Sequence, residues 1–425
     1  MSLNFSARLG AALTVPAMLL LAGPAARSAP AAPASAGPKA RYVMDATTMS
    51  GLPGMGGGKP DSGAMMRMMM GGGGANSVTH SLFLRLGSTL APSTGTPAAD
   101  HLPDPALRMG DALPLVTPVR TPGSEPDNFE RPRGRLLIFW GCGAHAGPGQ
   151  PVVIDFAKVA AGQIPPGLFS AHAPIERIVT LANSRTYGEW PNGRTAKQAP
   201  PGASLIGLQR VEGNYSPPMK FTTTQDFMPG LRTRSADTAD GATDVNWGAI
   251  AGATGYYANV IGAQETRGGG GDIVWWSSSA TREFGGGLND FLSPATVRRL
   301  VTDKVVMPPT QTSCTIPAEV KQAAGESMIG MLNAFGPEES FAFPPRPADP
   351  KIAWRPEWTA LVRHRSTTTF FFGEMAAAMN GMGDESARDD SDSPRPRQKP
   401  RNKACKPSLG GALSGMLGGK ACQEQ

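Results

Sequence analysis

The sharpest chemical suggestion in this sequence is a methionine-rich stretch near its beginning. Eight methionines lie between residues 44 and 70, and five of them form a block that only Arg67 interrupts. Thioether sulfur is a soft ligand suited to Cu(I), and the surrounding glycines would let several sulfurs approach one ion. The stretch predicts either a copper site or, in the interpretation we adopt, a flexible linker with methionine as an apolar filler. The copper hypothesis takes as its metal ligands Met65, Met66, Met68, Met69 and Met70.

Cysteine provides a second kind of sulfur chemistry. His145 follows Cys142 by three residues, a spacing that suits a thiol–imidazole pair or two metal ligands. The other histidines are scattered, whereas a metal site normally needs three or four ligands, so we interpret the cysteines as disulfide-forming. Four cysteines allow three pairings, and sequence alone does not choose among them. Proximity along the chain favours Cys405 with Cys422, which leaves Cys142 with Cys314.

Two aromatic residues stand among polar neighbours on a segment that we expect to be a loop. Tyr187 and Trp190 lie between Arg185 and Arg194. Aromatic faces beside hydrogen-bonding groups suit a carbohydrate or a peptide, and loops of a β-sandwich are common places for such sites. The alternative is that both rings anchor the loop to the core.

Motifs of known catalytic or cofactor sites are absent from the sequence. It contains no H-E-x-x-H, C-x-x-C or G-x-S-x-G pattern, and the glycines before Lys59 miss the spacing of a phosphate-binding loop. A catalytic triad can assemble in space without leaving a local motif, so an enzyme is left open. We expect a non-catalytic protein without a cofactor, copper being the alternative.

The first 36 residues have the pattern of a secretory signal peptide. Arg8 precedes an apolar run from Leu9 to Ala22, and the small residues that follow end in the cleavage motif Ala34-Ser35-Ala36. A run of about 14 residues is too short for a membrane-spanning helix, which needs roughly 20. We therefore expect a protein of the periplasm or the extracellular space, with no transmembrane span after the leader is removed. Disulfides are the default state of cysteine there.

The formal net charge is +6, and many of the cations lie near the end of the chain, behind an acidic cluster. Five acidic residues between 384 and 392 precede six cationic residues between 395 and 406, in a proline-rich context. This composition is typical of a solvated linker, and the alternative is attraction of the basic block to anionic lipid. No aromatic residues interleave with these cations to stack bases, so we exclude nucleic acid. The sequence does not identify a partner; the candidates are components of the cell envelope or another envelope protein.

Between the two ends, short apolar runs separated by turn residues predict a mainly β protein. Leu82, Leu84 and Leu86 alternate as on one face of a strand, and the run 135–140 is typical of a strand buried on both faces. We expect one or two β-sandwich-like domains with a few short helices, flanked by disordered N-terminal and C-terminal segments. The predicted divisions are a signal peptide (1–36), a Gly/Met-rich disordered segment (37–75), a first β-rich domain (76–200), a second β-sandwich-like domain with short helices (203–373), a charged disordered linker (374–404) and a Gly-rich C-terminal loop (405–425).

Proline marks two expected helices. Ser293 and Pro294 form an N-cap followed by proline at the first helical position. Pro317 opens a second helix, which the apolar spacing extends to Gly336. Residues 177–182 are expected to form a further strand.

One stretch resembles a known family. Val245-Asn-Trp247, a turn, and Tyr256-Tyr-Ala-Asn-Val260 resemble the second and third strands of fibronectin type III domains, which have an immunoglobulin-like β-sandwich fold. The resemblance implies that Trp247 is a core residue. The methionine block, in turn, resembles segments of periplasmic copper-handling proteins, which implies copper as its ligand.

Overall fold

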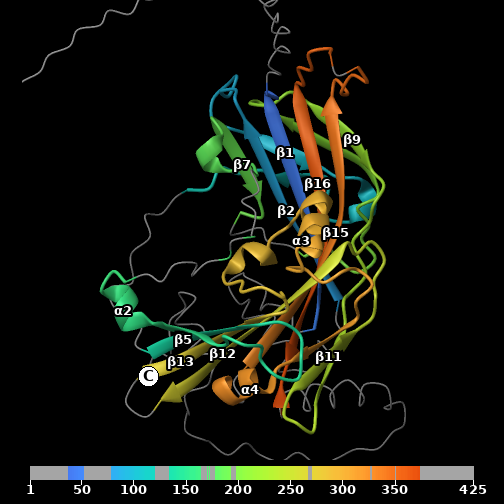
Figure 1. The fold of residues 1–425 in the computed structure, drawn as a ribbon. Helices are drawn as coiled ribbons and strands as arrows, with labels where there is room; N and C mark the ends of the chain where they lie inside the picture. The colour runs from blue at the N-terminus through green and yellow to red at the C-terminus, as the bar shows by residue number, and fades with distance from the viewer. Residues whose placement is uncertain are drawn as a thin grey trace, which may run out of the picture.

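The computed structural model of the chain shows a mainly β protein with three sheets and short helices (Figure 1). In the part of the chain that it describes, no helix is long and apolar enough to span a bilayer. The signal peptide, the charged linker and the C-terminal loop expected from the sequence lie outside the described residues. Those residues are 37–51, 78–119, 134–163, 170, 172, 178–192, 198–266, 270–325, 328–349 and 351–373.

A large sheet of nine strands is the backbone of the fold. Its strands are parallel at two places, β1 with β16 and β5 with β13, and antiparallel elsewhere. In sheet order the strands are β6 (Val152–Asp155), β5 (Gly134–Trp140), β13 (Gly270–Ser277), β12 (Gly255–Thr266), β15 (Met328–Phe343), β16 (Trp358–Phe371), β1 (Ala40–Ser50), β2 (Val78–Ser88) and β7 (Thr186–Trp190).

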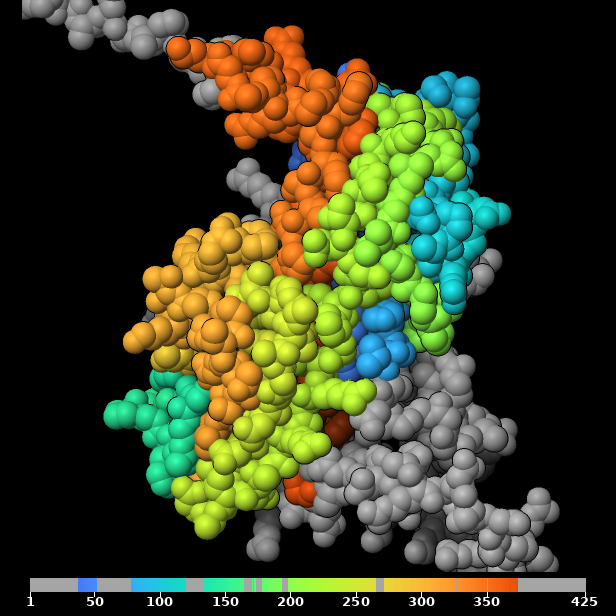
Figure 2. All heavy atoms as spheres, turned by 90° about the vertical axis from the view of Figure 1, so that its right-hand side faces the viewer, coloured from blue at the N-terminus to red at the C-terminus, as the bar shows by residue number. Residues whose placement is uncertain are grey.

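Two smaller sheets cover one face of the large sheet, which gives the fold its sandwich character. Trp358 and Val362 of β16 belong to the core beneath the first small sheet, and Phe370 belongs to the core beneath the second. Side chains alternate along a strand, so these even-numbered residues share one face (Figure 2 shows this covered side). The first small sheet is β4 (Leu113–Pro114), β3 (Ala99–Leu102), β8 (Gly207–Gly213) and β9 (Met219–Thr223); the second is β10 (Thr233–Asp237), β11 (Thr243–Trp247) and β14 (Ser313–Ile316).

Helical turns cover part of the opposite face. Tyr257 and Phe335 point away from the small sheets and pack with Leu292 and Leu300 around α3 (Pro294–Thr302). As expected from the sequence, the Ser293 side chain caps α3 by accepting a hydrogen bond from the Thr296 amide. The other helical elements are η1 (Pro105–Leu107), α2 (Phe156–Ala160), η2 (Leu181–Asn183), η3 (Gly286–Asn289) and α4 (Ala318–Ala324).

Two expected elements differ in the structure. The helix opened by Pro317 ends at Ala324, and β15 begins at Met328, because this segment pairs with β12 on one side and β16 on the other. Tertiary pairing thus overrides a helical spacing of apolar residues. Residues 178–180 are irregular and lead into η2 rather than forming a strand.

Strand β1 corrects the expectation of disorder across residues 37–75. Ala40–Ser50 lies between β16 and β2, so both of its edges are paired. The domain boundary predicted near residues 200–203 is likewise not found, because two of the sheets contain strands from both sides of it. Strands from both sides of it pair directly, as β3 does with β8 and β5 with β13.

Candidate functional site

The alternation of β1, β2 and β16 places polar side chains on the face that the small sheets leave open. Asp45 and Thr47 of β1 are the direct register partners of Arg363 and Arg365 of the parallel neighbour β16. Arg85 of β2 lies on the same face, diagonal to Asp45. Pleating therefore gathers three guanidinium groups from two strands on either side of β1.

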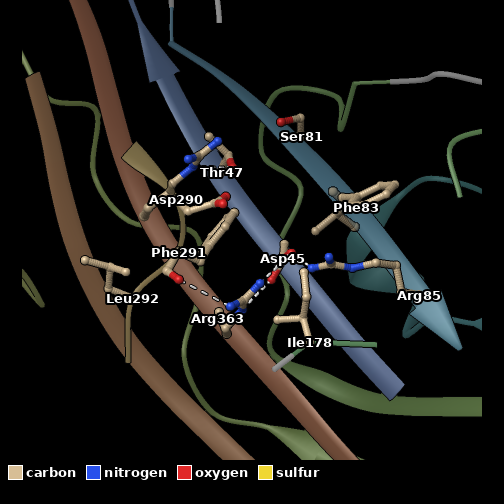
Figure 3. A pocket seen from close by; sticks show the side chains of 12 residues that line it. Asp45, Thr47, Ser81, Phe83, Arg85, Ile178, Asp290, Phe291, Leu292 and Arg363 are labelled. Carbon is tan, nitrogen blue, oxygen red and sulfur yellow. Dashed lines mark hydrogen bonds and ion pairs between the residues drawn. The ribbon is translucent and has the colours of Figure 1, made fainter. Parts of the chain in front are cut away.

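Asp45 lies between two of these arginines (Figure 3). Arg363 donates from Nε to Oδ1 at 2.7 Å and from Nη2 to Oδ2 at 2.9 Å, and Arg85 Nη2 donates to the same Oδ2. All three side chains are at least nine-tenths buried. One carboxylate thus serves two buried cations, and a carboxylate can accept such paired donors because it offers two oxygens.

Arg365 is the third cation of the cluster. Its Nη1 donates to the Asn289 carbonyl at 2.7 Å and its Nε donates to Thr47 Oγ1 at 3.2 Å. Its guanidinium carbon lies 4.4 Å from the centroid of the Phe291 ring, and that of Arg363 lies 4.9 Å from the same centroid. Burial lowers the pKa of Arg365 from its ordinary value, although arginine remains charged in proteins.

These side chains line a cavity of about 510 Å³. Its polar wall consists of the three arginines with Asp45 and Thr47, together with the Ser81 hydroxyl and the Asp290 carboxylate (Figure 3). Its apolar wall consists of Leu82, Phe83, Ile178, Phe291 and Leu292. We call this cavity the basic pocket.

The basic pocket has more cationic than anionic groups. Three arginines face two carboxylates, those of Asp45 and Asp290. Among the described residues, none accepts a hydrogen bond from Arg85 Nε, although this donor is buried. A buried charged donor without an acceptor is costly, and an anionic oxygen in the pocket would relieve that cost.

The aromatic pair expected to bind a ligand lies elsewhere, and its prediction as an exposed site is wrong. Tyr187 and Trp190 belong to β7, with only 4% and 1% of their surface exposed. Trp190 packs in the core under the first small sheet, and Tyr187 packs with Val43 and Val179. Neither ring offers a free face to a sugar or peptide, so the core-anchor alternative describes them.

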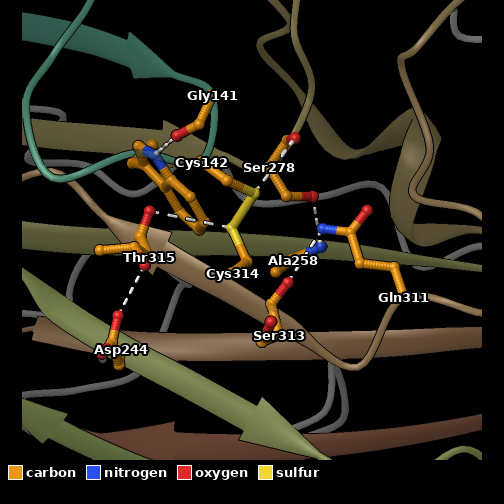
Figure 4. The surroundings of a disulfide bond; sticks show 10 residues. Gly141, Cys142, Asp244, Ala258, Ser278, Gln311, Ser313, Cys314 and Thr315 are labelled. Carbon is orange, nitrogen blue, oxygen red and sulfur yellow. Dashed lines mark hydrogen bonds between the residues drawn. A yellow bond between two sulfur atoms is a disulfide. The ribbon is translucent and has the colours of Figure 1, made fainter.

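Cys142 and Cys314 form a disulfide, the pairing expected from the sequence (Figure 4). It ties the loop after β5 to β14 across 172 residues of sequence. His145 does not pair with a thiol; its Nδ1 lies 3.2 Å from Glu319 Oε1.

The other sulfur predictions lie outside the described residues. Cys405, Cys422 and the methionines from Met65 to Met70 fall there, so their pairing and their copper site stay predictions. Within the described ranges, no three His, Cys, Asp or Glu side chains are grouped as metal ligands.

A serine, a histidine and a buried glutamate meet near the α2 end of the large sheet, in an arrangement unlike that of a hydrolase triad. Ser170 Oγ and His172 Nδ1 both bond to the Glu283 carboxylate, and Thr281 Oγ1 adds a third contact at 3.1 Å. In a triad the serine bonds to the imidazole and the acid bonds to its other nitrogen. Here the acid is the centre, which suits anchoring of the segment around residues 170 and 172.

Sequence reasoning missed the basic pocket. The sequence Arg363-His-Arg365 of β16 places two arginines on one face of a strand, and Asp45 interrupts an apolar run. Asp45 and Arg363 are 318 residues apart, so nothing local connects them. A charged residue inside an otherwise apolar strand is the one signal that pointed to a buried partner.

The fold and the pocket together define a mainly β protein with a basic, half-apolar pocket on one face of its large sheet. Comparison of the chain with protein-family models, curated proteins and solved structures finds no match. The function is therefore argued from the site itself.

Proposed function

We propose that this chain is an exported, non-catalytic binding protein whose basic pocket holds a small ligand with an anionic group and an apolar body. The observation that carries the proposal is the excess of buried cations around one cavity, with the Arg85 Nε donor unpaired among the described residues. Carboxylate or phosphate oxygens are the acceptors that match guanidinium donors best.

The shape of the pocket favours an amphiphilic ligand over a free ion. Its volume falls within the range of pockets that enclose small organic molecules. The side chains of Phe83, Ile178, Phe291 and Leu292 would cover a hydrocarbon or aromatic body, while the arginines fix the orientation of the anionic head.

Export is the second part of the proposal. The apolar leader predicts it, and the Cys142–Cys314 disulfide is the kind of bond that persists in an oxidising compartment. We also retain the likeness to fibronectin type III domains as a proposal. It is supported by the contact between Trp247 and Tyr256, whose ring centroids are 5.5 Å apart in the core.

Isothermal titration of the full chain with decanoate, decyl phosphate and decanol tests the pocket. We expect saturable binding of one or both anions, and affinity for decanol at least about tenfold lower, because a charge-assisted hydrogen bond is worth about 1.5–3 kcal/mol. The two anions distinguish a carboxylate ligand from a phosphate ligand.

Variants locate the binding. Arg365→Gln should weaken anion binding about tenfold, and Arg365→Lys should recover only part of it because lysine lacks the planar fork. The control is Arg234→Gln, which changes an exposed arginine of β10. Absence of saturable anion binding, or an equal loss in the control, would reject the proposal.

A further inference from the structure

The hairpin that joins β15 to β16 projects from one end of the large sheet. Residues 343–349 and 351–357 of this hairpin, here called the hairpin tip, extend beyond the body of the molecule (Figures 1 and 2). The tip is internally bonded: Trp354 Nε1 donates to the Pro344 carbonyl at 3.0 Å, and the Glu357 amide donates to the Phe343 carbonyl at 2.6 Å. It therefore presents its side chains in a fixed arrangement.

Large apolar side chains of the hairpin tip face solvent. Ile352 is 57% exposed and Phe343 is 53% exposed, which places them among the most exposed large apolar residues that the structure describes. Phe343 stacks on Trp358 with ring centroids 6.3 Å apart, so its ring is supported from behind. Trp354 is partly buried, with the Arg346 guanidinium 5.7 Å from its ring centroid.

Cationic side chains surround these apolar residues. Arg346, Lys351 and Arg355 are all exposed. Within the described part of the chain, no carboxylate lies within 4 Å of their charged nitrogens. The tip also contains two acids: Asp349 Oδ1 accepts a hydrogen bond from the Lys351 backbone amide at 2.9 Å, and Glu357 pairs with Lys39 at 3.3 Å. The tip thus combines an apolar point with unpaired positive charge.

We propose that the hairpin tip docks on the surface of an anionic lipid bilayer. Ile352 and Phe343 would enter the boundary between headgroups and acyl chains, and Trp354 suits the interface because its ring is apolar with one polar end. The three cations would lie among the lipid phosphates, each worth about 1 kcal/mol of attraction near such a surface.

Complementarity favours an anionic bilayer as the occupant, because its headgroups match the exposed cations and its acyl chains match Ile352 and Phe343. The described chain begins at Gly37 beside the tip, where the Ala40 amide donates to the Glu357 carbonyl at 3.2 Å. The first described residues therefore lie at the end of the sheet that carries the hairpin tip. This inference is independent of the basic pocket, which lies on the sheet face and not at its end.

Flotation of the full chain with lipid vesicles tests the proposal. We expect the protein to float with vesicles of equal parts phosphatidylglycerol and phosphatidylcholine, and to remain behind with phosphatidylcholine alone. Raising the salt concentration should reduce the bound fraction. Lys351→Gln and Arg355→Gln should each lower the partition coefficient about fivefold.

Ile352→Asp should lower it by at least as much, since it removes apolar insertion and adds an anion. Its matched control is Val153→Asp on the edge strand β6, where the side chain is 48% exposed. Thermal unfolding verifies that both variants fold. A third variant, with the six cations between 395 and 406 changed to glutamine, should keep its binding.

Three outcomes would overturn the inference. They are equal binding to both kinds of vesicle, loss of binding only in the variant of residues 395–406, and vesicle binding that survives Ile352→Asp. Self-association that Ile352→Asp abolishes, without vesicle binding, would assign the tip to a second copy of the chain instead. Arg365→Gln should leave flotation unchanged, so failure of the pocket proposal and failure of this one are distinguishable.

Discussion

Asp45 and Arg363 are direct register partners on adjacent parallel strands, and they form a two-point ion pair that is buried on both sides. Parallel pairing of β1 with β16 makes this contact possible although the residues are 318 positions apart. The pair fixes the arginine fork, and with it the polar wall of the basic pocket.

Removing the shared carboxylate should destabilise the fold strongly. Asp45→Asn leaves Arg85 and Arg363 buried side by side without their common anion, which costs about 3–5 kcal/mol for a broken buried pair. Urea denaturation measures the loss. Glu357→Gln, which breaks the half-exposed pair with Lys39, should change stability by less than about 1 kcal/mol. Equal effects of the two substitutions would contradict the structural role of Asp45.

Much of the fold could be predicted from the sequence because many strands have a local sequence pattern that is typical of a strand. β2 shows alternation, and β5 shows the unbroken apolar run of a strand buried on both faces, with Leu137 and Phe139 in one core and Leu136 and Ile138 in another. β11 and β12 likewise overlap the two stretches that resemble fibronectin type III strands.

The basic pocket could not be predicted because its residues are assembled by strand pairing. β1 is hard to recognise as a buried strand since Asp45 interrupts its apolar residues, and Asp45 is one of the side chains that build the site. β15 reads as a helix because Met328, Met331 and Leu332 also match a helical period. Its conformation is decided by pairing with β12 on one side and with β16, the next strand of the chain, on the other.

Breaking the disulfide should destabilise the fold by giving the unfolded chain more conformational freedom. The bond between Cys142 and Cys314 closes a loop of 172 residues, so opening it releases much chain entropy in the unfolded state. Replacing both with serine should cost about 2–5 kcal/mol, measured by urea unfolding. A reductant should produce a similar loss in the natural chain and almost none in the double variant. Equal sensitivity of both to the reductant would place the important disulfide elsewhere.

Gly188 of β7 lies too close to its neighbours for a side chain to fit without a shift. A Cβ added at Gly188 would lie 2.6 Å from the Leu115 carbonyl oxygen and 2.5 Å from Tyr215 Oη. Because backbone is involved, Gly188→Ala should cost about 1–3 kcal/mol through overpacking. Gly248→Ala is the control, since nothing lies within 4 Å of its added Cβ. Urea midpoints decide between them, and an unchanged midpoint in Gly188→Ala would refute the close packing of β7.

The stability of the protein should fall as the pH falls below about 6.5, because a fully buried histidine resists protonation in the folded state. His101 lies in the core, where Tyr42 Oη is 3.0 Å from its Nδ1. Burial lowers its pKa to about 3. The unfolded chain takes up this proton near the ordinary value of 6.5, whereas the folded chain does so only near 3.

The contribution of His101 is therefore complete above pH 6.5 and is lost as the pH falls towards 3, with a slope approaching about 1.4 kcal/mol per pH unit. Burial also lowers the pKa of His80 and of His364, so the total slope is shared. The informative quantity is the difference between the natural chain and His101→Gln, measured by urea unfolding from pH 7.5 down to pH 4. The variant should have the shallower slope, because it lacks the buried imidazole that the folded chain keeps unprotonated. Identical slopes in the natural chain and His101→Gln would mean that the folded chain takes up this proton as readily as the unfolded chain. That result would contradict the burial of His101 beside Tyr42.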